Sequence, residues 1–107
     1  MVINRFDIYL IDLDPTVGSE IQKTRPCLVV SPDEMNQHIR TVIVAPLTSR
    51  GRLYPTRVSC IFDGRKALVV LDQIRTVDIA RLGRKLGQID AETMTSVLAV
   101  LGRMFAP

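Results

Sequence analysis

The sequence has few of the residues that most hydrolytic and metal-dependent sites require. It contains no tryptophan, one histidine and two cysteines. With His38 alone, one chain cannot form a two-histidine acid–base pair, and the distant Cys27 and Cys60 form neither a metal motif nor a redox motif. We therefore expect no metal and no other cofactor. Both cysteines are expected to be buried thiols in apolar strands.

Long hydrophobic runs are also missing. The longest, such as residues 67–71 (ALVVL), fall far short of the roughly 20 apolar residues that cross a bilayer. Arg5 and Asp7 stand where an export signal would be apolar. These absences predict a cytoplasmic protein that makes no contact with a membrane. The 107 residues predict a single domain over residues 1–107, with a modest core that favours a homodimer.

Negative charge is absent from one long stretch. The chain has 14 Lys and Arg against 11 Asp and Glu, a net charge of +3, and 11 of the basic residues are arginine. No acidic residue lies between Glu34 and Asp63. Arginine pairs bidentately with phosphate, so the stretch suits a surface that faces a polyanion. A solvated face with chance clustering is the alternative. The arginines within the stretch are Arg40, Arg50, Arg52 and Arg57.

The apolar pattern predicts a mainly β protein. Alternating or β-branched segments indicate strands over residues 6–13, 27–31, 40–47, 56–62 and 66–71, with a helical turn near residues 34–37. Asp63-Gly64 is typical of a type I′ hairpin turn. Asp78 is expected to cap a short helix that ends at Gly83. A small barrel of five or six mostly antiparallel strands, closed or half-closed, would hide the sheet edges of so short a chain.

The last segment predicts an amphipathic helix that packs on the sheet. Asp90 is a good N-cap, and Glu92 favours the positive end of the helix dipole. An apolar stripe is expected at Met94, Val97, Leu98, Leu101 and Phe105.

Two polar loops carry the candidate chemistry. Residues 15–26 form a long connection, and a second loop covers residues 48–55. Pro26 holds the Arg25 backbone extended, so the side chain of Arg25 can be aimed. Neighbouring strands of a small barrel would bring Arg25 and Thr48 to the same rim. The residues alone therefore predict a phosphate-binding rim.

Four motifs, in order and with matching spacing, give a more specific interpretation. They cover residues 12–20 (DLDPTVGSE), 23–31 (KTRPCLVVS), 44–49 (VAPLTS) and 71–78 (LDQIRTVD). Together they resemble the MazF/PemK toxin family of bacterial toxin–antitoxin systems, and the resemblance extends over essentially the whole chain. It implies an SH3-like barrel of the CcdB/MazF type. It also implies a homodimer that cuts single-stranded RNA at short sequences without metal, and that a cognate acidic antitoxin neutralises.

The resemblance implies roles for the matching residues. Arg25 and Thr48 correspond to the central catalytic pair, in a reaction in which the ribose 2′-hydroxyl attacks the adjacent phosphate and leaves a 2′,3′-cyclic phosphate. An arginine is a poor general base, so Arg25 is expected to stabilise charge rather than transfer a proton. RNA contacts are expected from Lys23, Ser49, Arg50, Arg52, Asp72 and Gln73.

Some residues near the fourth motif depart from the family pattern. Certain members pair the acidic residue of this motif with an arginine two residues earlier, where this chain has Val70. Asp72 is therefore expected to lack that partner, and it is either a general base or a structural or RNA-contacting carboxylate. Arg75 is expected to be buried and paired with a carboxylate such as Asp78.

Two other functions compete with RNA cleavage. Toxins of the same fold that poison DNA gyrase act through a C-terminal tail containing tryptophan, which this chain does not have. A binding module of the SH3 type without catalysis would need a groove lined with aromatic residues, and the chain has only two Tyr and three Phe.

Overall fold

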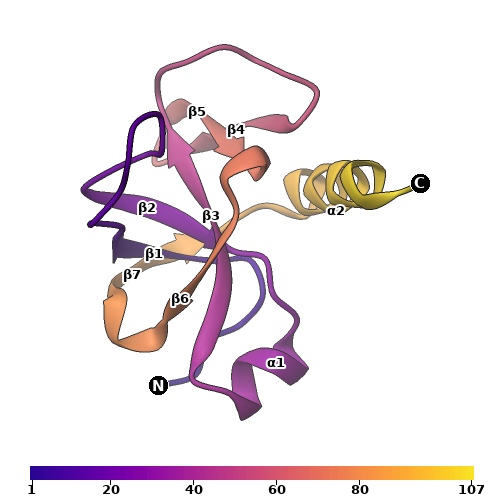
Figure 1. Ribbon diagram of the computed structural model, residues 1–107. Coiled ribbons are helices and arrows are strands. Elements are labelled where there is room, and N and C mark those ends of the chain that lie inside the picture. The colour runs from indigo at the N-terminus through magenta and orange to yellow at the C-terminus, as the bar shows by residue number, and fades with distance from the viewer.

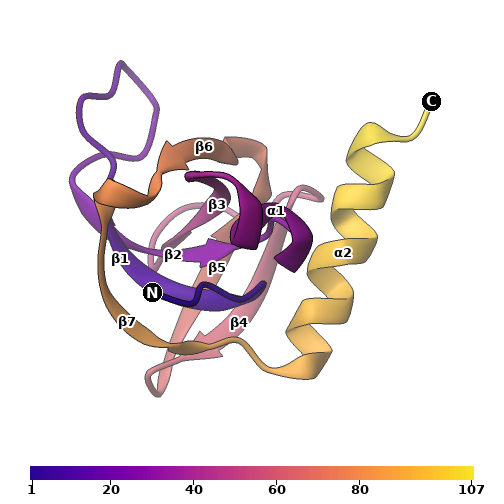
Figure 2. The same ribbon diagram turned by 90° about the horizontal axis from the view of Figure 1, so that it is seen from below.

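The computed structural model describes residues 1–107. Seven strands form one curled antiparallel sheet, and one long helix lies beside it (Figures 1 and 2). The fold class predicted from the sequence is therefore confirmed. In chain order the elements are β1 (Asp7–Asp12), β2 (Thr24–Val29), α1 (Asp33–His38), β3 (Thr41–Thr48), β4 (Arg57–Phe62), β5 (Arg65–Val70), the 3₁₀ turn η1 (Leu71–Gln73), β6 (Arg75–Asp78), the 3₁₀ turn η2 (Ile79–Arg81), β7 (Leu82–Gln88) and α2 (Ala91–Phe105).

The long strand β3 changes partners along its length. Its first part pairs with β2 on one side and β6 on the other, and its end pairs with β5 through Leu47–Val69 and Thr48–Leu68. Pairing with β2 stops at Cys27–Pro46. Pro46 has no N–H to donate, so it is a natural place for that ladder to end. The sheet consequently opens between the start of β2 and the end of β3.

Both faces of the central strands are buried. One cluster includes Tyr9, Val29 and Val44, and a second, on the opposite face, includes Leu28 and Ala45. This double burial explains why β2 and β3 have nearly continuous apolar runs rather than a clean alternation. Cys27 and Cys60 are free and buried, as expected, and burial raises the pKa of Cys27 to about 12.

Helix α2 begins where the sequence predicts, and Met94, Val97 and Leu101 of the predicted stripe pack on the core. Asp90 Oδ2 accepts a hydrogen bond of 3.0 Å from Thr93 N, which confirms the N-cap. Val97 and Val100 are buried, whereas Leu98 is 40% and Phe105 71% exposed. The helix packs on one side only, mainly against β4 and η1 (Figure 2), so the predicted stripe was too wide. None of the helices has the length and apolar composition needed to span a bilayer.

The sequence pattern missed β6 and β7. The expected helix over residues 78–82 is only the turn η2, although Asp78 does cap it by accepting from Ala80 N at 2.8 Å. Gly83 is not a helix terminator but a residue of β7, where a Cβ would lie 3.2 Å from Leu10 O. The edge of β1 needs a partner strand, and this outweighs the weak strand propensity of the segment. The hairpin at Asp63 (φ 53°) and Gly64 (φ 72°) is as predicted.

Candidate active site

Arg25 and Thr48 lie together, as predicted, at the place where β2 and β3 separate. Continuing the β2–β3 register two residues beyond Cys27–Pro46 sets Arg25 opposite Thr48. Both residues line a surface cleft of about 350 Å³, which we call the Arg25–Thr48 cleft. The polar lining of the cleft is mostly basic. It consists of the basic residues Arg25, Arg65 and Lys66, the hydroxyl residues Thr48 and Ser49, and the acidic residue Asp63.

Arg25 carries an uncompensated charge. Its side chain is exposed, and its only hydrogen bond runs from Nε to Gln22 O at 3.1 Å. The two ion pairs of the chain, Arg57–Asp72 and Lys85–Asp7, do not involve it. A guanidinium without a carboxylate partner keeps its terminal nitrogens available for an anion such as a phosphate.

The Thr48 hydroxyl is oriented by its own loop. Thr48 Oγ1 accepts a hydrogen bond of 3.2 Å from Arg50 N, which leaves the hydroxyl proton free to donate. Thr48 is half-buried, so this donor is held at the cleft wall. A fixed cation and a fixed hydroxyl donor in one cleft suit stabilisation of negative charge on phosphate oxygens.

Two loops adjoin Arg25 and Thr48 in the chain, and they carry four of the predicted RNA-binding residues on exposed positions, although only Ser49 among them lines the cleft. The loop between β1 and β2, residues 13–23, ends at Lys23, whose backbone adopts a positive φ of 70°. Lys23 N donates to Asp14 Oδ1 at 3.0 Å, and Lys23 O accepts from Leu13 N at 3.0 Å. The loop between β3 and β4, residues 49–56, carries Ser49, Arg50 and Arg52.

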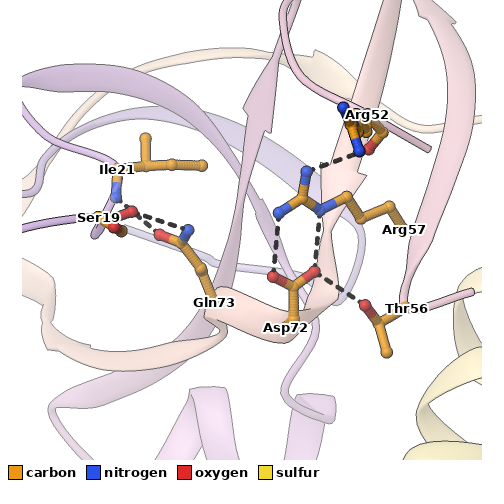
Figure 3. Close-up of polar contacts among 7 residues, drawn as sticks. All are labelled: Ser19, Ile21, Arg52, Thr56, Arg57, Asp72 and Gln73. Atoms are coloured by element: carbon orange, nitrogen blue, oxygen red, sulfur yellow. Dashed lines mark hydrogen bonds and ion pairs between the residues drawn. The ribbon is translucent and has the colours of Figure 1, made fainter. Parts of the chain in front are cut away.

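Asp72 has a partner that the sequence did not indicate. Arg57, from β4, donates from Nε to Asp72 Oδ1 at 3.1 Å and from Nη2 to Oδ2 at 3.2 Å (Figure 3). Asp72 thus lacks the partner two residues earlier, as expected, but it has another arginine partner that the sequence did not predict. Position 70 is indeed valine, but Arg57 reaches the carboxylate from the neighbouring strand. The signal available in the sequence was the absence of acidic residues around Arg57.

This ion pair lowers the basicity of Asp72. The hydrogen bond from Arg57 is the main cause that holds the pKa of the Asp72 carboxyl below its ordinary value of 3.8, and Thr56 Oγ1 donates a second bond at 3.0 Å. The pKa of Arg57 is raised by the same contact. A carboxylate with a lowered pKa is a weaker proton acceptor at neutral pH, which disfavours a general-base role for Asp72.

Gln73 faces the other loop. Its Oε1 accepts from Ile21 N at 2.7 Å, and its Nε2 donates to Ser19 O at 3.2 Å (Figure 3). Asp72 and Gln73 also border a second cavity of about 390 Å³ that includes Glu20. Their contact with RNA, expected from the sequence, stays a prediction.

Arg75 does not pair with a carboxylate. Its Nη1 donates to Leu13 O at 2.8 Å, and the chain's two ion pairs leave it out. Asp78 instead caps η2. The predicted pairing of Arg75 with a carboxylate was wrong, because the Arg75 guanidinium donates instead to the backbone carbonyl of Leu13, just after β1. Arg81 Nη1 adds bonds to Asp12 O at 3.1 Å and Asp14 O at 2.6 Å.

Comparison with known proteins agrees with this arrangement of strands and loops. Endoribonuclease EndoA of Bacillus subtilis (strain 168) is 38% identical over 106 residues, which cover 91% of this chain and 89% of that protein. A crystal structure of MazF from Deinococcus radiodurans superposes with a TM-score of 0.85 at 27% identity, covering 97% of this chain and 96% of the other. An endoribonuclease from a mycobacterial species, solved in complex with its cognate antitoxin, superposes with a TM-score of 0.82 at 27% identity, covering 98% of this chain and 97% of the other.

Fold and cleft thus define a small β toxin of the half-barrel type. Residues 4–105 match the family described as the PemK-like, MazF-like toxin of type II toxin–antitoxin systems. The chain belongs to this family, as the four sequence motifs predicted.

The Arg57–Asp72 pair predicts a pH-dependent contribution to stability. Because the pKa of Asp72 is lowered on folding, the pair stabilises the fold above pH 3.8, and the stabilisation is lost as the pH falls through the folded pKa. At about pH 7, Asp72→Asn should lower the free energy of unfolding by about 1 kcal/mol. Near pH 3 the difference in urea midpoint between variant and wild type should shrink. The exposed, unpaired Glu34 provides the control Glu34→Gln; a difference for Asp72→Asn that persists at low pH would contradict the assignment.

Proposed function

We propose that this chain is the toxin of a toxin–antitoxin pair and a sequence-specific endoribonuclease that cuts single-stranded messenger RNA without a metal. The observation that carries the proposal is the pairing of an unneutralised Arg25 with the Thr48 hydroxyl in one cleft. Membership of a family in which the B. subtilis relative is named an endoribonuclease supports it.

The cleft suits cleavage that starts from within the RNA. The ribose 2′-oxygen attacks the adjacent phosphorus as it loses its proton. The bond to the 5′-oxygen breaks, and that oxygen takes up a proton. The products are a 2′,3′-cyclic phosphate and a 5′-hydroxyl end. DNA has no 2′-hydroxyl and is therefore not a substrate.

Arg25 and Thr48 are the catalytic residues of this proposal. The pentavalent intermediate carries more negative charge on its equatorial oxygens than the starting phosphodiester. The Arg25 guanidinium neutralises that charge, and the Thr48 hydroxyl donates a hydrogen bond to the same oxygens. Arg25 stays positively charged throughout, because a guanidinium is not deprotonated in proteins.

RNA lies in the cleft and extends along the two loops that adjoin Arg25 and Thr48 in the chain. Lys23 on one side and Ser49, Arg50 and Arg52 on the other contact the sugar–phosphate backbone or the base edges. Asp72 and Gln73 lie outside the cleft and reach RNA only at the separate cavity of about 390 Å³ beside Glu20.

Protein partners follow from the surface. The net charge of +3 and the exposed arginines suit a cognate acidic antitoxin, and the mycobacterial relative was solved with its own antitoxin.

Leu53 and Ile61 are 66% and 61% exposed beside a cavity of about 470 Å³ that adjoins Thr48. A second copy of the chain covers this apolar area in the homodimer that we propose. The gyrase alternative finds no support among the relatives compared above.

The purified protein is expected to cut a mixed-sequence RNA in EDTA and to leave 5′-hydroxyl ends. Arg25→Ala should lower the rate of cleavage by roughly 10²-fold or more, as the loss of a transition-state donor does. Arg25→Lys should restore only part of it, because the planar fork is lost. The control is Arg103→Ala on α2, outside the cleft. A requirement for divalent metal, or 5′-phosphate ends, would refute the proposed reaction.

Salt dependence should identify the phosphate contacts. For a non-cleavable RNA, log K should fall against log salt by about 0.7 for each phosphate neutralised on a single strand. Arg50→Ala or Arg52→Ala should reduce the slope by about one such unit, equally for all sequences. An unchanged slope with an altered cleavage motif would show instead that the arginine reads a base.

Assembly is measured by sedimentation at micromolar concentration. We expect a species of twice the 12.0 kDa mass of the chain. Leu53→Asp, which places a charge in the apolar area, should shift the population toward monomer. A single 12.0 kDa species for the wild type would contradict the homodimer.

A further inference from the structure

Two adjacent side chains of η1 hold the loop that precedes Arg25 and the loop that follows Thr48. Figure 3 shows Gln73 directed toward Ser19 and Ile21, and Asp72 directed away from them toward Thr56 and Arg57. The two loops, residues 13–23 and 49–56, are far apart in sequence. They are connected through consecutive residues of one short turn.

The Asp72 side holds loop 49–56 through Arg57. The guanidinium that is fixed on the Asp72 carboxylate extends its remaining nitrogen, Nη1, to Arg52 O at 3.0 Å. The ring of Tyr54 lies 4.7 Å from the Arg57 guanidinium carbon. Thr56 binds Asp72 directly. The loop is thus attached at its middle and at its end, and the backbone carbonyl of an expected RNA-binding residue is one of the attachment points.

The Gln73 side holds loop 13–23 near its tip. The base of this loop is closed independently by the bonds between Leu13 and Lys23 and by Arg81. Among the hydrogen bonds of residues 16–21, the two to Gln73 are the only ones that leave the loop and its flanking strand residues. Both the oxygen and the nitrogen of the Gln73 side-chain amide are used in this contact.

The turn itself is immobilised by the core. Leu71 is fully buried in the cluster that contains Val97 and Val100 of α2. Its N–H donates to Thr56 O at 3.1 Å. Because the backbone of η1 is fixed by the core, the side chains of Asp72 and Gln73 hold the two loops at a fixed distance from the core.

We propose that Asp72 and Gln73 are positioning residues that set the spacing and order of the two substrate loops. Gln73 acts on loop 13–23 through Ile21 and Ser19, and Asp72 acts on loop 49–56 through Arg57. The inference rests on the proposed function for its meaning, because these loops carry Lys23, Ser49, Arg50 and Arg52. The contacts themselves do not depend on RNA.

The first test measures loop order without RNA, by hydrogen exchange of single amides in the full chain. Gln73→Ala should speed exchange of the Ile21 amide by about tenfold and leave the Arg57 amide, which donates to Tyr54 O, unchanged. Asp72→Ala should do the reverse. Gln73→Glu keeps the acceptor for Ile21 and should keep that amide protected. The exposed pair Gln37→Ala and Glu34→Ala are controls. If neither loop amide responds, the proposal is overturned, whether or not the protein cuts RNA.

The second test separates positioning from contact with RNA. Gln73→Ala and Asp72→Ala should raise KM for RNA by roughly tenfold and change kcat by less than about threefold, because both loops bind substrate and transition state alike. Arg57→Ala should match Asp72→Ala, and the double variant should be no worse than either single one. Asp72→Asn provides the same comparison should Asp72→Ala fold poorly.

Two results would refute the positioning role even if RNA is cut. One is Gln73→Glu losing as much activity as Gln73→Ala while Ile21 stays protected, which would mean that the amide touches RNA. The other is additive losses for Asp72→Ala and Arg57→Ala, which would mean that Asp72 acts on its own. If the wild type cuts no RNA, the proposed function fails, and the exchange measurements still decide the positioning role.

Discussion

The change of partner by β3 is the constraint on which the site depends. A strand that bonded to β2 along its whole length would close the sheet between Arg25 and Thr48. Pro46 ends that ladder, and β3 continues with β5 instead. The same change pairs β3 with β5, and β4 pairs in turn with β5 with Arg57 opposite Val70, so that Arg57 meets Asp72 in the following turn. Pro46, which has no N–H, therefore ends the β2–β3 ladder, and the separation of Arg25 from Thr48 and the pairing of β3 with β5 both follow from that end.

Two arginines that each stand at or near the end of a strand differ in how their charge is compensated. Arg57 contacts Asp72, the Tyr54 ring and the Arg52 carbonyl, so its guanidinium has a structural role. Arg25 has a single bond to Gln22 O and keeps its charge for an anion. Net charge alone could not have distinguished them. The distinction comes from which of them meets a carboxylate in three dimensions.

The sequence predicted the parts of the fold whose signals are local. Five strands, the Asp63-Gly64 turn and the Asp90 cap follow from short-range chemistry. The expected pairing of neighbouring strands in a small barrel predicted that Arg25 and Thr48 share a rim. Strand β7 was not predicted, because its glycines and charged residues have weak strand propensity. It forms a strand because it pairs with β1. The Arg57–Asp72 pair escaped because it joins residues far apart in sequence. The exposure of Phe105 depends on how much of α2 the sheet covers, which periodicity does not state.

The hold on the loops is made largely through backbone atoms. Gln73 binds the carbonyl of Ser19 and the amide of Ile21, and Arg57 binds the carbonyl of Arg52. None of these contacts depends on which side chain stands at positions 19, 21 or 52. Substitutions there are therefore free to alter the surface that meets a nucleotide while the path of the chain stays the same. Under the proposed function, such a fold can acquire a new target sequence by point mutation, because the residues that would contact RNA differ from those that place the loops.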